Sequence, residues 1–393
     1  MKKIYLVGAG MGRDCLTAAA QKAVDAAEVI IGAKRLVDSL EKQTFAEYRP
    51  EFIREYIDGS DKNTFCVLLS GDTGFYSGAK AILAALDGYD TQVLAGISSF
   101  AYFFAAIKRD YNDVVLASLH GRKCSAVSLI KRHKRVFFLL DAKSAGDIID
   151  SLCLYNMGDT RLYIGESLSY PDERITVGTA AELKDRAFDT LTVMLAENDG
   201  ARSCLGSIPD GEFIRGNVPM TKAEIRALSI AKLGLCEDSI LYDIGAGTGS
   251  VSVEAAQYLP RGSVYAFEKN AEALELIQKN KIKFAADNLY IVAGEVPQSL
   301  DLDKYPVPTH AFVGGSGDPE KTLDILFGKN RGLRAVMTAV TLETLSALTR
   351  LSKKYSTEVC CINAARAESA GAFHLMKANN PVYIAVLTEK NNE

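Results

Sequence analysis

The chain has 393 residues, of which 48% are hydrophobic and 24% are charged, and its formal net charge is −4. This balance excludes an intrinsically disordered protein, and the length predicts roughly two or three globular domains. A nucleic-acid-binding protein would typically show an excess of basic residues, which this composition lacks. No uninterrupted apolar stretch reaches about 18 residues, so we expect neither a membrane span nor a nucleic-acid partner.

Cysteine and histidine are placed unfavourably for metal binding. The 8 cysteines form no Cys-x-x-Cys pair, and the 4 histidines are isolated from one another. Because a structural metal site needs several such ligands at short spacings, we expect no metal site. The apolar run that begins at Ile4 is interrupted by Arg13 and Asp14, and therefore does not fit an export signal. We expect reduced thiols and a cytoplasmic protein.

Predicted strands and helices alternate along almost the whole chain. In the first half, runs rich in Val, Ile and Leu predict strands at residues 4–7, 29–31, 65–69, 91–94, 136–140 and 161–164, with antiparallel strands near 174–178 and 190–195. In the second half the same pattern predicts strands at residues 240–244, 263–268, 289–293, 310–313, 334–339 and 382–387. Apolar strands separated by helices are typical of parallel sheets covered on both faces, so the expected fold class is α/β.

A segment rich in Gly, Pro, Asn, Asp and Ser lies between residues 198 and 211. These residue types favour turns and loops, and such a cluster is typical of a linker between domains. We therefore predict two domains, residues 1–205 and 206–393.

A glycine-rich turn follows the predicted strand 240–244 and precedes a predicted helix. Gly245, Gly247 and Gly249 allow the backbone to turn tightly and to approach a ligand at the helix N-terminus. Ser250 stands where the dinucleotide-binding fingerprint Gly-x-Gly-x-x-Gly needs its last glycine, which disfavours a nucleotide-dependent oxidoreductase.

Two carboxylates flank this turn. Asp243, at the end of the strand, is a poor neighbour for a pyrophosphate but suits a ligand with an ammonium and a sulfonium group. Glu268, at the end of the next predicted strand, can accept hydrogen bonds from ribose hydroxyls. The strand, the turn and the two carboxylates together predict a binding site for S-adenosylmethionine (SAM).

The first half contains a second turn of this kind, at Gly8, Gly10 and Gly12. Its spacing alone is equally compatible with a plain tight turn, and Arg13 occupies the place of the last glycine of a dinucleotide site. Four further segments follow, SGDTGFYSG (70–78), GISSF (96–100), SLHGR (118–122) and ESLSYPDERI (166–175). Together with the turn, they resemble the tetrapyrrole (corrin and porphyrin) methylase family over residues 1 to 200.

This resemblance implies a fold of two α/β subdomains and methylation of a late precorrin at C5 in cobalamin synthesis. Thr73 stands where the family usually has proline. The resemblance also implies SAM contacts at Gly8, Gly10, Asp72, Phe75, Ser98 and Ser99.

The second half resembles the class I SAM-dependent methyltransferases that methylate precorrins at C15 and decarboxylate them. The resemblance rests on VPMTKAEIR (218–226), the glycine-rich turn, GEVP (294–297), VGGSG (313–317) and NPV (380–382), while Asp318 stands where another glycine is expected. It implies a Rossmann-like domain that removes the carboxyl group of the C12 acetate side chain. The SAM contacts, some of which the spacing also predicts, are Asp243, Gly245, Gly247, Thr248, Glu268, Glu295, Val296, Gly314 and Gly315.

A precorrin, with or without cobalt, carries many carboxylates, so each substrate pocket should contain basic residues. In the second domain we expect Lys222 and Arg226, which are four positions apart at the start of a predicted helix and therefore on one face. In the first domain the candidate cations are Arg122 and Arg13, and His120 is a candidate acid or base.

Two other segments have simpler interpretations. The basic cluster at residues 131–135 precedes an apolar strand and is expected to form a solvated loop. The aromatic run at residues 100–104 is expected to pack in a helix core.

The leading hypothesis is a bifunctional enzyme that binds one SAM in each domain, acts on an anionic precorrin and forms at least a dimer. One alternative is a SAM-dependent RNA methyltransferase. The net acidic charge and the lack of an Asn/Asp-Pro-Pro-Tyr/Phe sequence at residues 313–317 disfavour it. Another is a non-catalytic SAM-binding scaffold, whose first domain has lost activity through changes such as Thr73.

Overall fold

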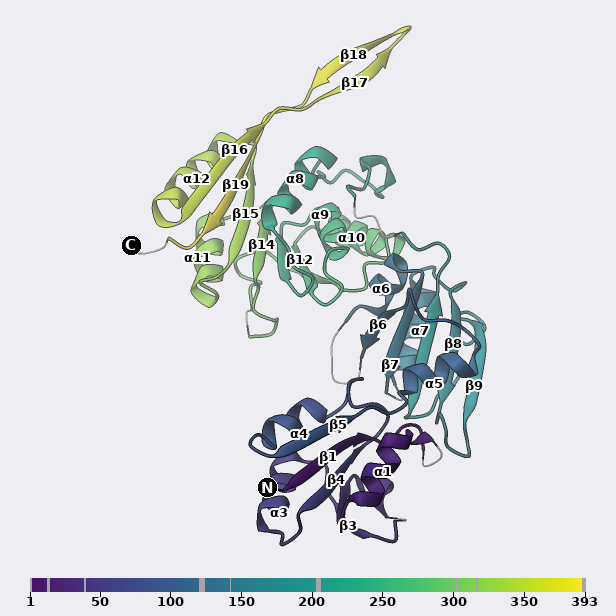
Figure 1. Ribbon diagram of the computed structural model, residues 1–393. Helices are drawn as coiled ribbons and strands as arrows, with labels where there is room; N and C mark the ends of the chain where they lie inside the picture. The colour runs from purple at the N-terminus through teal and green to yellow at the C-terminus, as the bar shows by residue number, and fades with distance from the viewer. Residues whose placement is uncertain are drawn as a thin grey trace.

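The computed structural model describes residues 2–12, 15–38, 40–119, 124–141, 143–202, 206–301, 303–315 and 317–390. Their strands form three large sheets and one two-stranded hairpin, and Figure 1 shows the sheets as successive lobes along the chain. The expected α/β fold class is confirmed. Within the described ranges, no helix is both long enough and apolar enough to cross a membrane.

The first lobe is a five-stranded sheet in the order β3-β2-β4-β1-β5, and every neighbouring pair is parallel. Its strands are β1 (Lys3–Gly8), β2 (Val29–Gly32), β3 (Gln43–Ala46), β4 (Thr64–Leu69) and β5 (Asp90–Leu94). Its helices are α1 (Ala18–Ala26), α2 (Lys34–Val37), α3 (Pro50–Gly59) and α4 (Ala79–Ala85). Because the strands are parallel, the loops that follow β1, β4 and β5 lie at the same edge of the sheet.

The second lobe is a five-stranded sheet in the order β6-β7-β10-β8-β9, in which only β6 and β7 are parallel neighbours. Its strands are β6 (Val115–Ser118), β7 (Arg135–Leu140), β8 (Arg161–Glu166), β9 (Arg174–Thr179) and β10 (Thr192–Glu197). Its helices are α5 (Ser99–Ala106), α6 (Ala126–Arg132) and α7 (Ser144–Leu154). The predicted antiparallel strands near residues 174–178 and 190–195 are confirmed as β9 and β10.

The third lobe is a seven-stranded sheet in the order β13-β12-β11-β14-β15-β19-β16. Its strands are β11 (Ile240–Ile244), β12 (Ser263–Glu268), β13 (Leu289–Ala293), β14 (His310–Val313), β15 (Arg334–Ala339), β16 (Ser356–Ile362) and β19 (Val382–Thr388). Its helices are α8 (Ala223–Leu233), α9 (Ser250–Ala256), α10 (Ala271–Lys283), α11 (Pro319–Lys329) and α12 (Leu342–Lys354). The strands β11 to β15 are parallel to one another, whereas β19 is antiparallel to both β15 and β16, so the loops after β11 to β15 share one edge.

A hairpin of β17 (Ala365–Ala370) and β18 (Phe373–Ala378) projects away from the third lobe, as Figure 1 shows. It carries Phe373, Leu375 and Met376, whose exposed fractions are 75%, 62% and 68%. The sequence analysis missed this hairpin and also β3, β6 and β16. The last three are short or largely exposed edge strands, so their apolar signal is weak.

Helix α6 joins the second lobe to the third (Figure 1), and it contradicts the expected solvated loop at residues 131–135. Lys131 Nζ donates to the carbonyl of Phe284, and an Arg132 guanidinium nitrogen donates to the carbonyl of Gln257 at 3.2 Å. Phe284 and Gln257 are the C-terminal caps of α10 and α9, where backbone carbonyls have no N–H donor within the helix. The two cationic side chains of α6 supply the missing donors. At the other end of α6, the Ser125 N–H donates to the carbonyl of Pro260 at 2.8 Å.

The predicted domain boundary near residue 205 falls on Ser203, Cys204 and Leu205, which lie outside the described residues. On the C-terminal side, Asp210 begins a short 3₁₀ helix, Asp210–Glu212, that leads to α8. The division into residues 1–205 and 206–393 remains a prediction.

Candidate active sites

The turn after β11 is built on glycines that approach neighbouring backbone too closely for a side chain. A Cβ atom on Gly245, whose φ is +72°, would collide with the carbonyl oxygen of Gly315. A Cβ atom on Gly247, whose φ is +56°, would lie 3.0 Å from the carbonyl oxygen of Pro219. Gly249, at φ +75°, is the N-cap of α9. The turn is therefore held between the 217–222 segment and the loop after β14.

Glu268 ties this turn to the end of β12. One carboxylate oxygen accepts the Gly247 N–H at 2.8 Å, and the other accepts the N–H groups of Lys269 and Asn270 at 2.8 and 2.9 Å. A carboxylate has about four acceptor positions, so Glu268 retains capacity for a ligand hydroxyl group. This arrangement fits the predicted role in ribose binding.

Asp243 is almost completely buried beside the turn. Its Oδ2 accepts a hydrogen bond from the Ser252 hydroxyl, while its Oδ1 has no hydrogen-bond partner among the described residues. Burial raises the pKa of Asp243 to about 7, and the negative charge of Glu268 contributes in the same direction. The Thr248 hydroxyl is also buried without a described partner. An unpaired buried carboxylate is unfavourable, so a nearby cationic ligand would stabilise its ionised form.

A cavity of about 1010 Å³ opens at this edge of the third sheet. Ligand pockets usually measure roughly 300–1,000 Å³, so the volume suffices for SAM and part of a second ligand. Asp243 and Thr248 are buried and do not belong to its lining. The predicted cofactor residues that do line it are Gly245, Gly247, Glu268, Glu295, Val296, Gly314 and Gly315.

The far side of the cavity is formed by residues 317–320, the end of β15 and one face of α12. Its apolar lining includes Met220, Met337 and Val340, and Val340 is 63% exposed. Leu342, at the start of α12, is 80% exposed close by in the chain. Exposed apolar side chains beside a cavity are suited to contact with a large, partly apolar ligand.

Three cationic side chains line the cavity among the residues that the structure describes. Lys269 Nζ donates to Glu295 at 2.6 Å, and Arg350 Nε donates to Glu320 at 2.7 Å. Lys222 is half-buried, and its ammonium has neither a hydrogen bond nor an ion pair with any described residue. Of the three, Lys222 therefore offers a positive charge that is not already neutralised.

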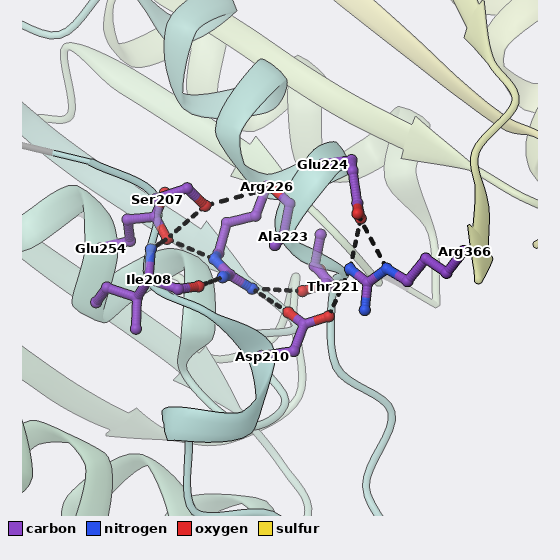
Figure 2. A network of polar contacts seen from close by, with 9 residues as sticks. All are labelled: Ser207, Ile208, Asp210, Thr221, Ala223, Glu224, Arg226, Glu254 and Arg366. Carbon is purple, nitrogen blue, oxygen red and sulfur yellow. Dashed lines mark hydrogen bonds and ion pairs between the residues drawn. The ribbon is translucent and has the colours of Figure 1, made fainter. Parts of the chain in front are cut away.

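Arg226 lies in a different environment from Lys222, which contradicts the expectation that the two share one face. Lys222 is the N-cap that precedes α8, whereas Arg226 is inside the helix and fully buried. Figure 2 shows that the guanidinium of Arg226 donates to Glu254 at 2.6 Å and pairs with Asp210 at 3.2 Å. It also donates to the carbonyl of Thr221 at 2.7 Å. Arg226 is therefore a structural residue of this network rather than a cation that lines the cavity.

The first lobe has a comparable crowded edge at the ends of β1, β4 and β5. A Cβ atom on Gly8 would lie 2.7 Å from the Gly71 carbonyl oxygen and 2.7 Å from the Gly96 nitrogen. Gly10, at φ +66°, exchanges two backbone hydrogen bonds with Gly71, each 3.0 Å long. The predicted residues Gly8 and Gly10 thus lie in a tight backbone cradle, which only glycine permits.

Asp72 connects the loops of this cradle. Its two carboxylate oxygens accept the N–H groups of Gly74 at 2.8 Å and of Gly96 at 3.0 Å. The carboxylate thereby holds the loop after β4 against the loop after β5. The contacts of Asp72 therefore support a role in positioning these loops. The contact between Asp72 and SAM remains a prediction.

The remaining predicted residues of the first site gather at the start of α5. Ser98 is the N-cap and accepts the Ala101 N–H at 3.1 Å, and Ser99 is the first residue of the helix. Phe75 stacks on Phe100, with ring centroids 5.5 Å apart.

The aromatic run that begins at Phe100 belongs to the second lobe's core. Phe103 and Phe104 are fully buried and pack with Phe137, so the expected core role is confirmed for them. Phe100 itself is only partly buried and also contacts Phe137, with ring centroids 5.0 Å apart.

The candidates Arg13, His120 and Arg122 lie outside the described residues. Arg35, which the sequence analysis did not single out, follows β2 at the same edge of the first sheet. Its guanidinium donates to the Tyr170 hydroxyl at 3.4 Å and so reaches from the first lobe to the second. Its position directly after a parallel strand could have been noticed in the sequence, because ligands bind at the edge of the sheet where parallel strands end.

Two family models match successive parts of the chain. Residues 3–184 match the model of the tetrapyrrole (corrin/porphyrin) methylases, and residues 212–389 match the model of the precorrin methyltransferase domain. The second half is similar to a cobalt-precorrin-6B C(15)-methyltransferase (decarboxylating) of Salmonella typhimurium. The two are 40% identical over 189 residues, which cover 47% of this chain and 96% of the relative.

One relative matches across both halves. A precorrin-6Y C(5,15)-methyltransferase (decarboxylating) of a Sinorhizobium species is 27% identical over 326 residues, which cover 80% of this chain and 78% of the relative. Among solved structures, a precorrin-6y C5,15-methyltransferase of Geobacter metallireducens is 36% identical to this chain. The match covers 47% of this chain and 98% of that structure, with a TM-score of 0.44.

Proposed function

Because this chain belongs to the precorrin methyltransferase family, with a tetrapyrrole methylase domain in front, we propose that it methylates a late precorrin at C5 and C15. It also removes the carboxyl group of the C12 acetate side chain. The observation that carries the proposal is the presence of two glycine-built loops, each at the edge of its own sheet where parallel strands end. The methyl donor is SAM, which supplies an electrophilic methyl group to a nucleophilic carbon when it is bound.

In the second domain the protein's part is to bind and orient. The turn at Gly245 and Gly247 has no side chains, so the backbone can approach the ligand closely, and Glu268 accepts hydroxyl groups. The apolar side chains of Met220, Met337 and Val340 contact the macrocycle and exclude water. Because SAM has an excellent leaving group and a reduced tetrapyrrole supplies its own nucleophile, orientation accounts for much of the acceleration.

The substrate's carboxylates require positive charge in a cavity that also contains acidic residues. Glu295 and Glu320 are paired with Lys269 and Arg350, so those carboxylates do not repel the substrate strongly. The free ammonium of Lys222 attracts a carboxylate of the substrate.

Incubation of the full chain with methyl-labelled SAM and a precorrin-6 species tests the function. Metal-free and cobalt-bearing substrates are supplied separately, and the products are weighed by mass spectrometry. The expected product gains two methyl groups and loses one CO₂. A product without a mass change with either substrate would refute the proposal.

We also propose that the chain forms a homo-oligomer through the hairpin of β17 and β18. Phe373, Leu375 and Met376 expose apolar surface on a two-stranded ribbon that has no covering element among the described residues. Such ribbons are marginal alone and gain stability by packing against another surface. Light scattering should give a multiple of the 42.5 kDa chain mass, and serine at these three positions should lower it.

A cytoplasmic location is the last part of the proposal. The seven cysteines that lie in the described ranges are free thiols, as expected for a reducing compartment.

A further inference from the structure

Decarboxylation of the acetate side chain creates a chemical demand that methyl transfer does not meet. The bond between the methylene carbon and the carboxyl carbon breaks, CO₂ leaves, and the electron pair remains with the methylene carbon and its conjugated system. A new C–H bond must then form to convert this carbon to a methyl group. The cavity must therefore supply one proton to a carbon atom, by a group positioned for general acid catalysis.

Few groups that line the cavity can donate this proton. Its described lining contains no histidine, cysteine or tyrosine. The Glu343 carboxyl is held ionised, because its own backbone N–H and Thr341 lower its pKa. The guanidinium of Arg350 does not deprotonate in proteins. Asp243 has a raised pKa, but it is buried outside the lining.

Five other carboxyl groups belong to the described lining, and each is already engaged as a hydrogen-bond acceptor: Glu268, Glu272, Glu295, Asp318 and Glu320. Two of the cations in the lining are ammonium groups, and their surroundings differ. Lys269 is bonded to Glu295 at 2.6 Å, which raises its pKa and holds its proton. Lys222 has no such partner among the described residues, so its three N–H bonds are free to face a substrate. Lys222 is thus the ammonium group of the lining whose protons are not used in a contact with another described residue.

The backbone that carries Lys222 is fixed from three directions, although its side chain is free. The carbonyl of Thr221 accepts the buried guanidinium of Arg226 at 2.7 Å. The carbonyl of Pro219 packs against the cofactor turn, 3.0 Å from the Cβ position of Gly247. The N–H of Asn217 donates to Glu272 at 2.9 Å. These contacts hold the start of the Lys222 side chain beside the cofactor turn, where the methyl transfer takes place.

We propose that Lys222 is the general acid of the decarboxylation, and that Arg226 is a positioning residue that acts through the Thr221 carbonyl. This inference rests on the proposed function of the second domain. The Lys222 ammonium gives one proton to the methylene carbon as CO₂ departs, and the neutral amine then takes a proton from solvent at the mouth of the cavity.

The test compares Lys222→Arg with Lys222→Met in the full chain. Arginine keeps the positive charge but cannot donate its proton, so it distinguishes proton transfer from anion binding. The C5 methyl group, which the first domain adds, is an internal control in each reaction. Lys279→Met is a matched control, because Lys279 lies on α10 outside the cavity and, among the described residues, forms an ion pair with the exposed Glu275 alone.

The expected result is a loss of decarboxylated product of about 10²-fold in both Lys222 variants, which is the usual scale of general acid catalysis. C5 methylation and the number of SAM molecules bound in a calorimetric titration should not change. In D₂O the wild-type product should carry one deuterium in the new side-chain methyl group. Added methylammonium should restore part of the activity of Lys222→Ala.

Three outcomes would overturn the inference. Full decarboxylation by Lys222→Arg would show that the charge alone matters, and full decarboxylation by Lys222→Met would remove Lys222 from the reaction. Failure of methylammonium to restore Lys222→Ala, with SAM binding intact, would contradict proton donation at this position. A wild-type chain that adds no methyl group would instead refute the proposed function, so the two failures are distinguishable.

Discussion

Replacement of Arg226 by methionine should destabilise the second domain without removing a catalytic group. The guanidinium is fully buried and pairs with Glu254 at 2.6 Å and Asp210 at 3.2 Å. Methionine fills much of the volume but leaves Glu254 buried without its partner, which costs about 3–5 kcal/mol. In a domain of 150–250 residues this corresponds to a fall in Tm of about 6–20 °C.

Differential scanning calorimetry of the full chain measures this effect. Lys222→Met should change the free energy of unfolding by less than about 0.5 kcal/mol, because Lys222 has no partner in the described chain to lose. Adding Glu254→Gln to Arg226→Met should recover part of the loss, because the unpaired buried charge is removed. An unchanged Tm for Arg226→Met together with a loss of C15 methylation would refute the reasoning, since Arg226 would then act on the substrate.

Further measurements test the cofactor turn and the contact between lobes. Because the pKa of Asp243 is raised to about 7, its carboxyl is mostly protonated at pH 6 and mostly ionised at pH 8, and the ionised form favours cationic SAM. Affinity of the second site should therefore rise roughly tenfold over this interval, and a flat profile in calorimetric titration would contradict the linkage. Gly245→Ala should reduce the binding stoichiometry from two SAM to one, because its methyl group would collide with Gly315; a retained second site would disprove that steric argument. Loss of both helix-end contacts in Lys131→Ala/Arg132→Ala should separate the second and third lobes, and X-ray scattering should detect a larger radius of gyration. An unchanged radius would mean that the other contacts of α6 suffice.

The order of strands and the position of both cofactor turns follow from local sequence. All twelve strands predicted from apolar runs appear in the structure, and most of them bury that run between helices, whereas β5 is a largely exposed edge strand. The two turns are equally visible in the sequence, since a positive φ and a close backbone approach leave glycine as the tolerated residue.

The strands that escaped prediction show where local pattern fails. The hairpin strand β18 is exposed along its whole length, so no apolar alternation marks one buried face. Strand β16 is a largely exposed edge strand that pairs with β19. The two strands are far apart in the sequence, so a short local pattern does not reveal their pairing. Such elements are determined by their partners rather than by their own composition.

The sequence by itself determined the α/β class, the two glycine-built turns and the acidic residues beside the second turn, because backbone conformation and strand ends depend on neighbours within a few positions. Only the tertiary structure decided which cations face the ligand. Lys222 and Arg226 are equivalent in charge and adjacent in a helical pattern, yet Glu254 and Asp210 from other segments enclose Arg226 and leave Lys222 in the cavity. The same holds for Lys131, whose charge satisfies a helix end in another lobe. A side chain's role depends on the groups that desolvate and pair it, and these are brought together by the fold.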